Sequence, residues 1–264
     1  MSLAMLFFMG WAVIAVMFAR AWMWSVKVDN YSLVDAFWAL GIGITAVLWL
    51  VLDGGGVAKH HVAAILIACW SLRLSSHLAR RIRTAHPEED ARYGALRERW
   101  RGRERAAFFG FFQIQGLSVV LLALPFLFIG ADTGTFGIWE SVGTAVCVLA
   151  IVGESVADHQ MSAFRKRNEG RQAVCDVGLW RYSRHPNYFC EFMTWVGFYL
   201  FACGSGFGWL MLHSPLLILF LLLRVTGVPP SEESSLASKG DAYRSYQRRT
   251  SVFIPLPPRK DTQP

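Results

Sequence analysis

Long apolar runs alternate with polar segments along the whole chain. A hydrocarbon core of about 30 Å requires about 20 mostly apolar residues in each helix that crosses it. Seven runs meet or approach this length, and the third and sixth are short or interrupted. The pattern predicts an all-α integral membrane protein with seven transmembrane helices, at residues 3–24, 34–52, 62–79, 107–130, 137–157, 188–203 and 208–227.

Composition supports this class of protein. Of 264 residues, 54% are hydrophobic and only 17% are charged, whereas a soluble domain carries about 25% charged residues. A soluble enzyme and a disordered chain are therefore excluded. The five cysteines show no CxxC spacing and the histidines are not grouped, so we expect neither a disulfide framework nor a metal site. No repeat of fixed period occurs, and residues 1–264 are expected to form one polytopic membrane domain.

The basic residues indicate how the spans are oriented. Nearly all Lys and Arg outside the spans lie in the loops at 25–33, 80–106 and 158–187 and in the tail. The intervening loops, near 53–61, 131–136 and 204–207, contain one basic residue, Lys59. Because cytoplasmic loops are rich in Lys and Arg, we expect an outside N-terminus and a cytoplasmic C-terminus. This topology also accounts for the net charge of +7, and no nucleic-acid partner is predicted.

Several ionisable residues fall inside the predicted spans, where each costs several kcal/mol unless it is paired or faces water. Most lie toward the cytoplasmic halves of their helices, which favours a polar cavity open to the cytoplasm. Structural ion pairs between helices are the alternative. These residues are Asp35, Arg73, His77, Glu140, Glu154, Asp158, Glu191 and Arg224.

Three polar residues in the first four spans have two readings each. Asp35 begins the second span, where an acid stabilises the helix N-terminus or could act as an acid toward a substrate carbonyl. Gln113 and Gln115 lie in FFQIQGLSV, where amides either hydrogen-bond to another helix or bind a polar group of the substrate.

The densest polar constellation surrounds the sequence Arg184-His185-Pro186-Asn187-Tyr188. Pro186 is tolerated in the first turn of the following span. Asn187 and Glu191 are four residues apart and share a helix face, where an amide and a carboxylate could bind a carboxamide or a ribose. Basic residues upstream, on a helix that continues out of the fifth span, could hold phosphates; they are Arg165, Lys166, Arg167 and Arg171.

The tail adds aromatic and basic residues. Tyr243 and Tyr246, with Arg244, Arg248 and Arg249, could line a nucleotide pocket, although an interfacial helix would show the same composition. The sequence lacks GxGxxG, GxxxxGK[ST], HExxH and GxSxG, so a nucleotide would be held without a Rossmann or P-loop element.

The sequence RHPNYFCE, followed by EESSL and KGDAYRSYQRRTSVFIP, resembles the DUF1295 branch of the steroid 5α-reductase superfamily. These are integral membrane reductases that use NADPH. The similarity is strongest over residues 150–258 and extends through WSLRLSSHLARR and FFQIQG. It implies that spans 1–4 (1–130) form the lipid-substrate side and spans 5–7 (137–258) the cofactor side.

The resemblance also implies roles for individual residues. Asn187 and Glu191 would bind the nicotinamide end of NADPH, and Asp158, Arg165 and Arg171 the ribose and phosphates. Asp35 and His77 are the candidate catalytic residues. The remaining candidates for the cofactor are Arg73, Arg184, His185, Tyr188, Arg224 and Tyr243, and those for the substrate are Trp70, Gln113 and Gln115. Trp70 stands where the steroid 5α-reductases have a tyrosine, and Val228 and Glu232 lie near where that family has a His and a Tyr.

The implied reaction is hydride transfer from NADPH to the activated double bond of a lipid such as a 3-oxo-Δ4-steroid. A membrane methyltransferase that uses S-adenosylmethionine, like the isoprenylcysteine carboxyl methyltransferases, is the alternative, because those enzymes share RHP-x-Y and the acidic tail. A transporter or lipid-binding protein is a third possibility. We expect a monomer in a bacterial inner membrane, or in the endoplasmic reticulum if the chain is eukaryotic.

Overall fold

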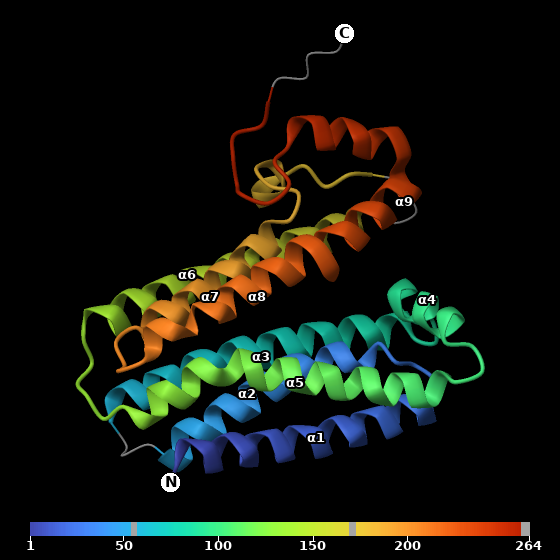
Figure 1. The fold of residues 1–264 in the computed structure, drawn as a ribbon. Helices are drawn as coiled ribbons and strands as arrows, with labels where there is room; N and C mark the ends of the chain where they lie inside the picture. The colour runs from blue at the N-terminus through green and yellow to red at the C-terminus, as the bar shows by residue number, and fades with distance from the viewer. Residues whose placement is uncertain (54–56, 169–172, 260–264) are drawn as a thin grey trace. The chain divides into compact units, whose positions relative to one another are not determined.

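The computed structural model describes residues 1–53, 57–168 and 173–259, which are helical apart from short connections. An isolated parallel bridge between Ser183 and Ser251 is the one strand-like pairing in these ranges. The long helices, shown in Figure 1, are α1 (Leu3–Val28), α2 (Leu33–Asp53), α3 (Ala58–Ala85), α4 (Ala91–Arg99), α5 (Glu104–Ala131), α6 (Ile138–Arg167), α7 (Pro186–Ala202), α8 (His213–Phe220) and α9 (Val228–Arg249). Short 3₁₀ turns occur at η1 (Gly178–Arg181) and η2 (Gly208–Leu212), and a π-helical turn at η3 (Leu221–Val225).

Every predicted span coincides with helical structure. Within the described ranges, six helical segments are long and apolar enough to cross a membrane: Leu3–Val28, Leu33–Leu52, Ala58–Ala85, Glu104–Ala131, Ile138–Arg167 and Gly208–Arg249. The sixth predicted span is α7, a helix of 17 residues that does not belong to this set. The chain is thus a multi-pass integral membrane protein. The count of seven and the orientation of the termini stay predictions.

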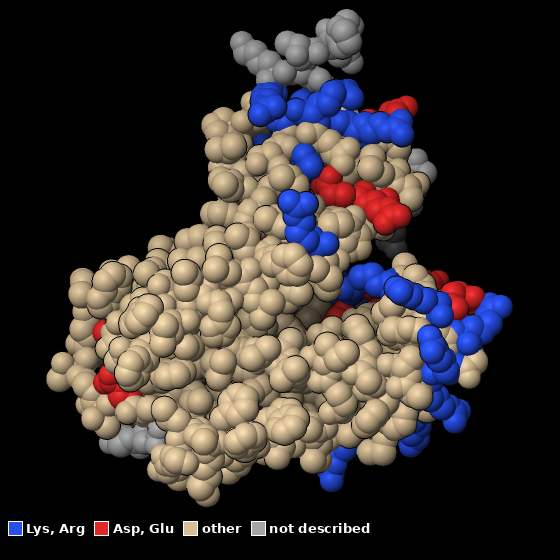
Figure 2. Space-filling view, in the orientation of Figure 1, with Lys and Arg blue, Asp and Glu red and all other residues tan. Residues whose placement is uncertain are grey.

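The sides of the long helices present apolar side chains. Phe8 and Trp11 on α1 are 60% and 47% exposed, and Trp139 and Leu149 on α6 are 50% and 73% exposed. Figure 2 shows broad surface areas without Lys, Arg, Asp or Glu. Large exposed apolar surface is rare on a soluble monomer, and here it fits contact with lipid.

The chain divides into two compact units. Unit 1 comprises Met1–Thr144 with Tyr199–Ser214, and unit 2 comprises Ala145–Phe198 with Pro215–Pro264. Each unit therefore consists of two stretches of chain.

Small residues allow the helices of unit 1 to pack closely. A Cβ at Gly10 would lie 2.7 Å from the indole nitrogen of Trp49, which donates a hydrogen bond to the carbonyl of Leu6. Likewise, a Cβ at Gly43 on α2 would lie 2.3 Å from the hydroxyl of Ser71 on α3. Close approach at small residues is typical of helices in membranes, where lipid supplies no hydrophobic drive for helix association.

The three loops expected on the outer face meet at one carboxylate, that of Asp132. This carboxylate pairs with Lys59 and accepts hydrogen bonds from the backbone N–H groups of Gly134 and Gly206, at 2.7 and 3.0 Å. The Lys59 side chain is fully buried. The single basic residue of these loops is therefore part of a structural ion pair.

Candidate functional site

In unit 2, a carboxylate joins the RHPNY turn to the tail helix. Glu232, in the first turns of α9, accepts hydrogen bonds from Arg184 Nε at 2.9 Å and Nη2 at 3.0 Å, and its Oε1 lies 3.0 Å from His185 Nε2. It also accepts from the Tyr243 hydroxyl at 2.6 Å and from the Gln247 amide. The side chains of Arg184, His185 and Glu232 are 11%, 6% and 14% exposed. Multiple charge-assisted hydrogen bonds in such surroundings are strong, so this cluster, which we call the Glu232 cluster, fixes the turn against α9.

The chain beyond α9 strengthens this connection. Arg184 donates to the carbonyls of Gln247 and Thr250 at 3.1 and 2.7 Å, and its backbone N–H donates to the carbonyl of Ser251 at 2.8 Å. The Ser183 hydroxyl donates to the carbonyl of Phe253 at 2.8 Å. Carbonyl groups of the tail thus accept hydrogen bonds from the Arg184 guanidinium, the Arg184 backbone N–H and the Ser183 hydroxyl. The tail is therefore part of the site.

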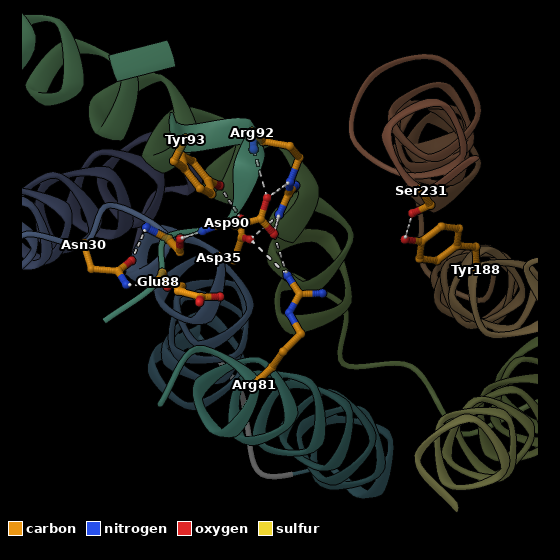
Figure 3. A network of polar contacts seen from close by, with 10 residues as sticks. Asn30, Asp35, Arg81, Glu88, Asp90, Arg92, Tyr93, Tyr188 and Ser231 are labelled. Carbon is orange, nitrogen blue, oxygen red and sulfur yellow. Dashed lines mark hydrogen bonds and ion pairs between the residues drawn. The ribbon is translucent and has the colours of Figure 1, made fainter. Parts of the chain in front are cut away.

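The aromatic residue of the motif packs on its histidine. The rings of His185 and Tyr188 are stacked, with centroids 5.2 Å apart and an interplanar angle of 1°. The Tyr188 hydroxyl lies 3.0 Å from the hydroxyl of Ser231, one residue before Glu232 (Figure 3). Tyr188 therefore holds the imidazole toward the Glu232 cluster.

Asn187 pairs with a carboxylate on the neighbouring helix of unit 2. Its amide nitrogen donates to Asp158 Oδ1 at 3.3 Å. Its amide oxygen is buried and accepts no hydrogen bond from the described residues. One turn further along α7, Glu191 is buried and accepts from the Trp195 indole at 2.9 Å. Asn187 and Glu191 lie four residues apart on α7 and so share a face of this helix; their role toward a cofactor stays a prediction.

The other predicted cofactor residues of unit 2 lie at helix ends. Arg165 is exposed in the last turn of α6, and this helix extends beyond the predicted span at 137–157 and ends at Arg167. Arg224 is exposed in the π-helical turn η3; such turns are rare and occur often at functional sites. Arg171 lies outside the described residues.

In unit 1, Asp35 is the centre of a second polar cluster (Figure 3). Its carboxylate accepts from Arg92 Nη2 at 2.8 Å and from the Tyr93 hydroxyl at 2.6 Å, both on α4. Arg92 also donates to Asp90, which in turn accepts from Arg81 at 3.2 Å. The Asp35 carboxylate accepts both hydrogen bonds, and the donors at this place are Tyr93 and Arg92. A role of Asp35 as a carbonyl-side acid stays a prediction.

The charges around Asp90 lead to a prediction for acid sensitivity. Burial alone would raise the pKa of Asp90, but hydrogen bonds and charge from Arg92, with the charge of Arg81, outweigh it and hold the pKa below its ordinary value of 3.8. A depressed pKa stabilises the fold above the unfolded-state value, and this contribution is lost as the pH falls through the folded-state value. We expect the melting temperature to fall below about pH 4, and Asp90→Asn to reduce this dependence. An equal acid response in both proteins would contradict the assignment.

The remaining candidates in unit 1 for catalysis, cofactor and substrate lie on α3 and α5. Trp70 is fully buried, and Arg73 and His77 are half-buried one turn apart on the same face of α3. Gln113 and Gln115 are two residues apart on α5 and so do not share a face. The amide nitrogen of Gln113 is buried and donates no hydrogen bond to the described residues.

Two features of these clusters were not assigned a role from the sequence. Glu232 stands near a position where the steroid 5α-reductases have a His or a Tyr, and Tyr93 lies in α4, a helix of nine residues between predicted spans. Tyr243 and Gln247 are four residues apart and share a helix face, but Glu232 precedes the kink of α9 at Gly240 (φ +51°), so helical spacing does not relate it to them. Nor does any local signal link Tyr93 to Asp35, which are 58 residues apart.

Fold and site together define a multi-pass helical membrane protein whose RHPNY turn is anchored by its C-terminal tail. A family model described as "Protein of unknown function (DUF1295)" matches residues 21–250, and the chain belongs to this family. The family named from the motif and tail is thereby confirmed. A similar protein from Schizosaccharomyces pombe, described as "Uncharacterized protein C594.04c", is 27% identical over an alignment of 271 positions, gaps included; the alignment covers 89% of this chain and 75% of the relative. No solved structure matches.

Proposed function

We propose that this protein is an NADPH-dependent membrane reductase of an activated C=C bond in a lipid, with 3-oxo-Δ4-steroids as the favoured substrate class. The observation that carries the proposal is the hydrogen bond between Asn187 and Asp158. Asn187 follows the turn that the Glu232 cluster connects to the tail, so the motif and the tail form one polar site. The resemblance of RHPNYFCE and the tail to the steroid 5α-reductase superfamily supports the same reaction class.

The residues of unit 2 fit a nicotinamide nucleotide. The buried amide oxygen of Asn187 has no hydrogen-bond donor among the described residues, and a buried acceptor without a donor costs about 1–3 kcal/mol. A carboxamide N–H would satisfy it, while Asp158 holds the amide nitrogen and so fixes the orientation of the side chain. Exposed basic residues at the end of α6 supply charge for phosphates. When bound, NADPH supplies the hydride.

The residues of unit 1 would act on the enone oxygen. Negative charge develops on this oxygen during reduction, and a donor positioned there lowers the barrier. Arg92 is the donor that Asp35 holds in place, because its guanidinium has five N–H groups, whereas the single O–H of Tyr93 is donated to Asp35. The role of Asp35 in this proposal is to orient Arg92, and the second donor is the buried amide nitrogen of Gln113 or the His77 ring. Protonation of the α-carbon then completes the reduction.

Cofactor identity is the first test. Protein purified in detergent is denatured, and the released small molecules are identified by mass spectrometry; NADPH and S-adenosylmethionine are then titrated into protein stripped of ligand. We expect NADPH to bind and to be oxidised on addition of a 3-oxo-Δ4-steroid. Binding of S-adenosylmethionine with methyl transfer would replace the proposal by the methyltransferase, and binding of neither would favour a protein that is not an enzyme.

A substitution at the motif tests the proposed role of Asn187. Asn187→Ala removes the amide that would bind the carboxamide, so we expect NADPH affinity to fall by about tenfold or more, which corresponds to one or two hydrogen bonds. Asp35→Asn is the matched variant in unit 1 and should lower turnover while leaving NADPH affinity unchanged. Unchanged NADPH affinity in Asn187→Ala would remove this residue from the site.

A further inference from the structure

The chain beyond α9 lies against the start of α7, within unit 2. The ring of Phe253 packs on the rings of Phe189 and Phe192, with centroids 5.7 and 6.0 Å apart, and Phe253 is buried. Phe189 and Phe192 are in the first two turns of α7 and belong to the sixth predicted span, at 188–203. A helix rises 1.5 Å per residue, so both lie within about 9 Å of Pro186. The tail in Figure 1 therefore returns to the level at which α7 is predicted to enter the membrane.

Large apolar side chains on either side of Phe253 are exposed. The side chains of Ile254 and Leu256 are more than half exposed, and Val252 is exposed as well. Tyr182, whose carbonyl accepts from the Leu256 N–H at 3.0 Å, is a fourth exposed side chain at this place. Neighbouring exposed apolar groups mark contact with a protein or a membrane, and tyrosine is enriched where a membrane meets water. In a solvated loop these side chains would stay in water.

The backbone of residues 255–259 offers no free N–H group. Three of these five residues have no N–H because they are prolines: Pro255, Pro257 and Pro258. The N–H of Leu256 donates to the carbonyl of Tyr182 at 3.0 Å. The N–H of Arg259 donates to the carbonyl of Arg249 at 2.9 Å. An unpaired backbone donor is costly in apolar surroundings, so this segment can lie against lipid without that cost.

Basic side chains flank the apolar ones. Arg181 directly precedes Tyr182, and Arg259 follows the three prolines. Both arginines are exposed, and neither pairs with a carboxylate of the described residues. Basic residues beside apolar groups that enter a membrane are attracted by the negative potential of anionic lipids. The surface therefore combines apolar side chains with positive charge.

We propose that residues 252–259, together with Arg181 and Tyr182, form an interfacial anchor that lies on the membrane surface and binds anionic phospholipids. We call this segment the tail anchor. Its exposed apolar side chains enter the boundary between headgroups and acyl chains, and its two arginines contact lipid phosphates with their apolar stems in the same layer. A membrane is favoured over a protein partner because Phe253 holds the tail anchor beside a predicted span. The inference is independent of the reaction proposed above.

A photoreactive side chain tests where the tail anchor lies. Benzoylphenylalanine is placed at position 254 of the full-length protein, which is reconstituted in nanodiscs of phosphatidylcholine and phosphatidylglycerol, irradiated and analysed by mass spectrometry. We expect an adduct with the mass of one phospholipid. Position 241 is the control, because the side chain of Asp241 on α9 is almost fully exposed, and it should give no lipid adduct. Position 256 is a second probe site, so that a folding defect at 254 does not decide the test.

The same experiment identifies the lipid. With the two phospholipids in equal amounts, we expect adducts of phosphatidylglycerol to exceed those of phosphatidylcholine by about fivefold or more, the effect of one basic residue at an anionic surface. Arg181→Gln combined with Arg259→Gln should bring this ratio close to one. Arg244→Gln is the matched control, because Arg244 already pairs with Asp241, and it should keep the ratio. Both lipids are present on both faces of a nanodisc, so the result does not depend on the predicted orientation.

Three results would overturn the inference. Adducts with a second copy of the chain in place of lipid would make the surface a contact between proteins. Folded protein that gives no lipid adduct at 254 and 256, or as much at 241, would show that the tail does not lie on the membrane. A ratio of one in the unaltered protein, or an equal fall of the ratio in Arg244→Gln, would remove the binding of anionic lipid.

Discussion

Glu232→Gln is expected to be among the most damaging single substitutions in unit 2. Glutamine keeps the shape and one acceptor but removes the negative charge, so the guanidinium of Arg184, 11% exposed, loses its counter-charge. Removal of one partner of a largely buried ion pair costs about 3–5 kcal/mol. The hydrogen bonds of His185 and Tyr243 to the carboxylate weaken at the same time. We therefore expect a lower melting temperature in detergent and faster proteolysis of the tail.

Glu233→Gln is the matched control, because Glu233 is the exposed neighbour with the same charge. Its melting temperature should stay at that of the unaltered protein. The proposed function adds a second readout: NADPH affinity should fall in Glu232→Gln under conditions in which the protein is still folded, since the cluster positions the turn before Asn187. Equal melting curves for both variants would show that the Glu232 cluster contributes no net stability.

Asp132→Ala should destabilise unit 1 to a similar extent. The substitution leaves Lys59 as a fully buried cation without its carboxylate and removes the acceptor of the Gly134 and Gly206 N–H groups. An uncompensated buried charge costs about 3–5 kcal/mol. Thermal unfolding in detergent measures the loss.

A double variant separates charge from shape. Lys59→Met combined with Asp132→Ala removes both charges, so it should recover part of the stability that Asp132→Ala alone loses, as a double-mutant cycle requires for a coupled pair. Asp241→Ala is the exposed comparison, because Asp241 pairs with Arg244 at a side-chain exposure of 93% and such pairs contribute little. A double variant no more stable than Asp132→Ala would show that the charge of Lys59 is not the cause.

The long apolar helices were predictable from the sequence because each one coincides with a run of mostly apolar residues. Apolar length places the span at 107–130 close to the observed helix Glu104–Ala131, but it misses polar extensions, since the helix predicted at 137–157 continues to Arg167. The sixth span stays a prediction, because α7 has 17 residues and is shorter than the six long apolar helical segments.

The contacts between distant residues were not predictable in the same way. Asp35 and Tyr93, or Arg184 and Glu232, meet only through tertiary structure, and no periodicity relates them. Asp35 shows the limit most clearly: an acid at a helix N-terminus has the same local pattern whether it stabilises the helix, orients α4 or acts on a substrate. The hydrogen bonds from Arg92 and Tyr93 show that Asp35 orients α4. Whether Asp35 also acts in catalysis is tested by the turnover of Asp35→Asn.

The dependence of the RHPNY turn on the tail has a consequence for biosynthesis. Arg184 and Thr250, which share a hydrogen bond, are 66 residues apart, a stretch that a ribosome needs roughly 3–13 s to translate at about 5–20 residues per second. During that interval the nascent turn holds an arginine and a histidine with none of their later partners. A product cut short before Glu232 keeps every span up to α8 and yet lacks this closure. Completion of the chain, rather than insertion of its helices, is therefore the step that completes the Glu232 cluster.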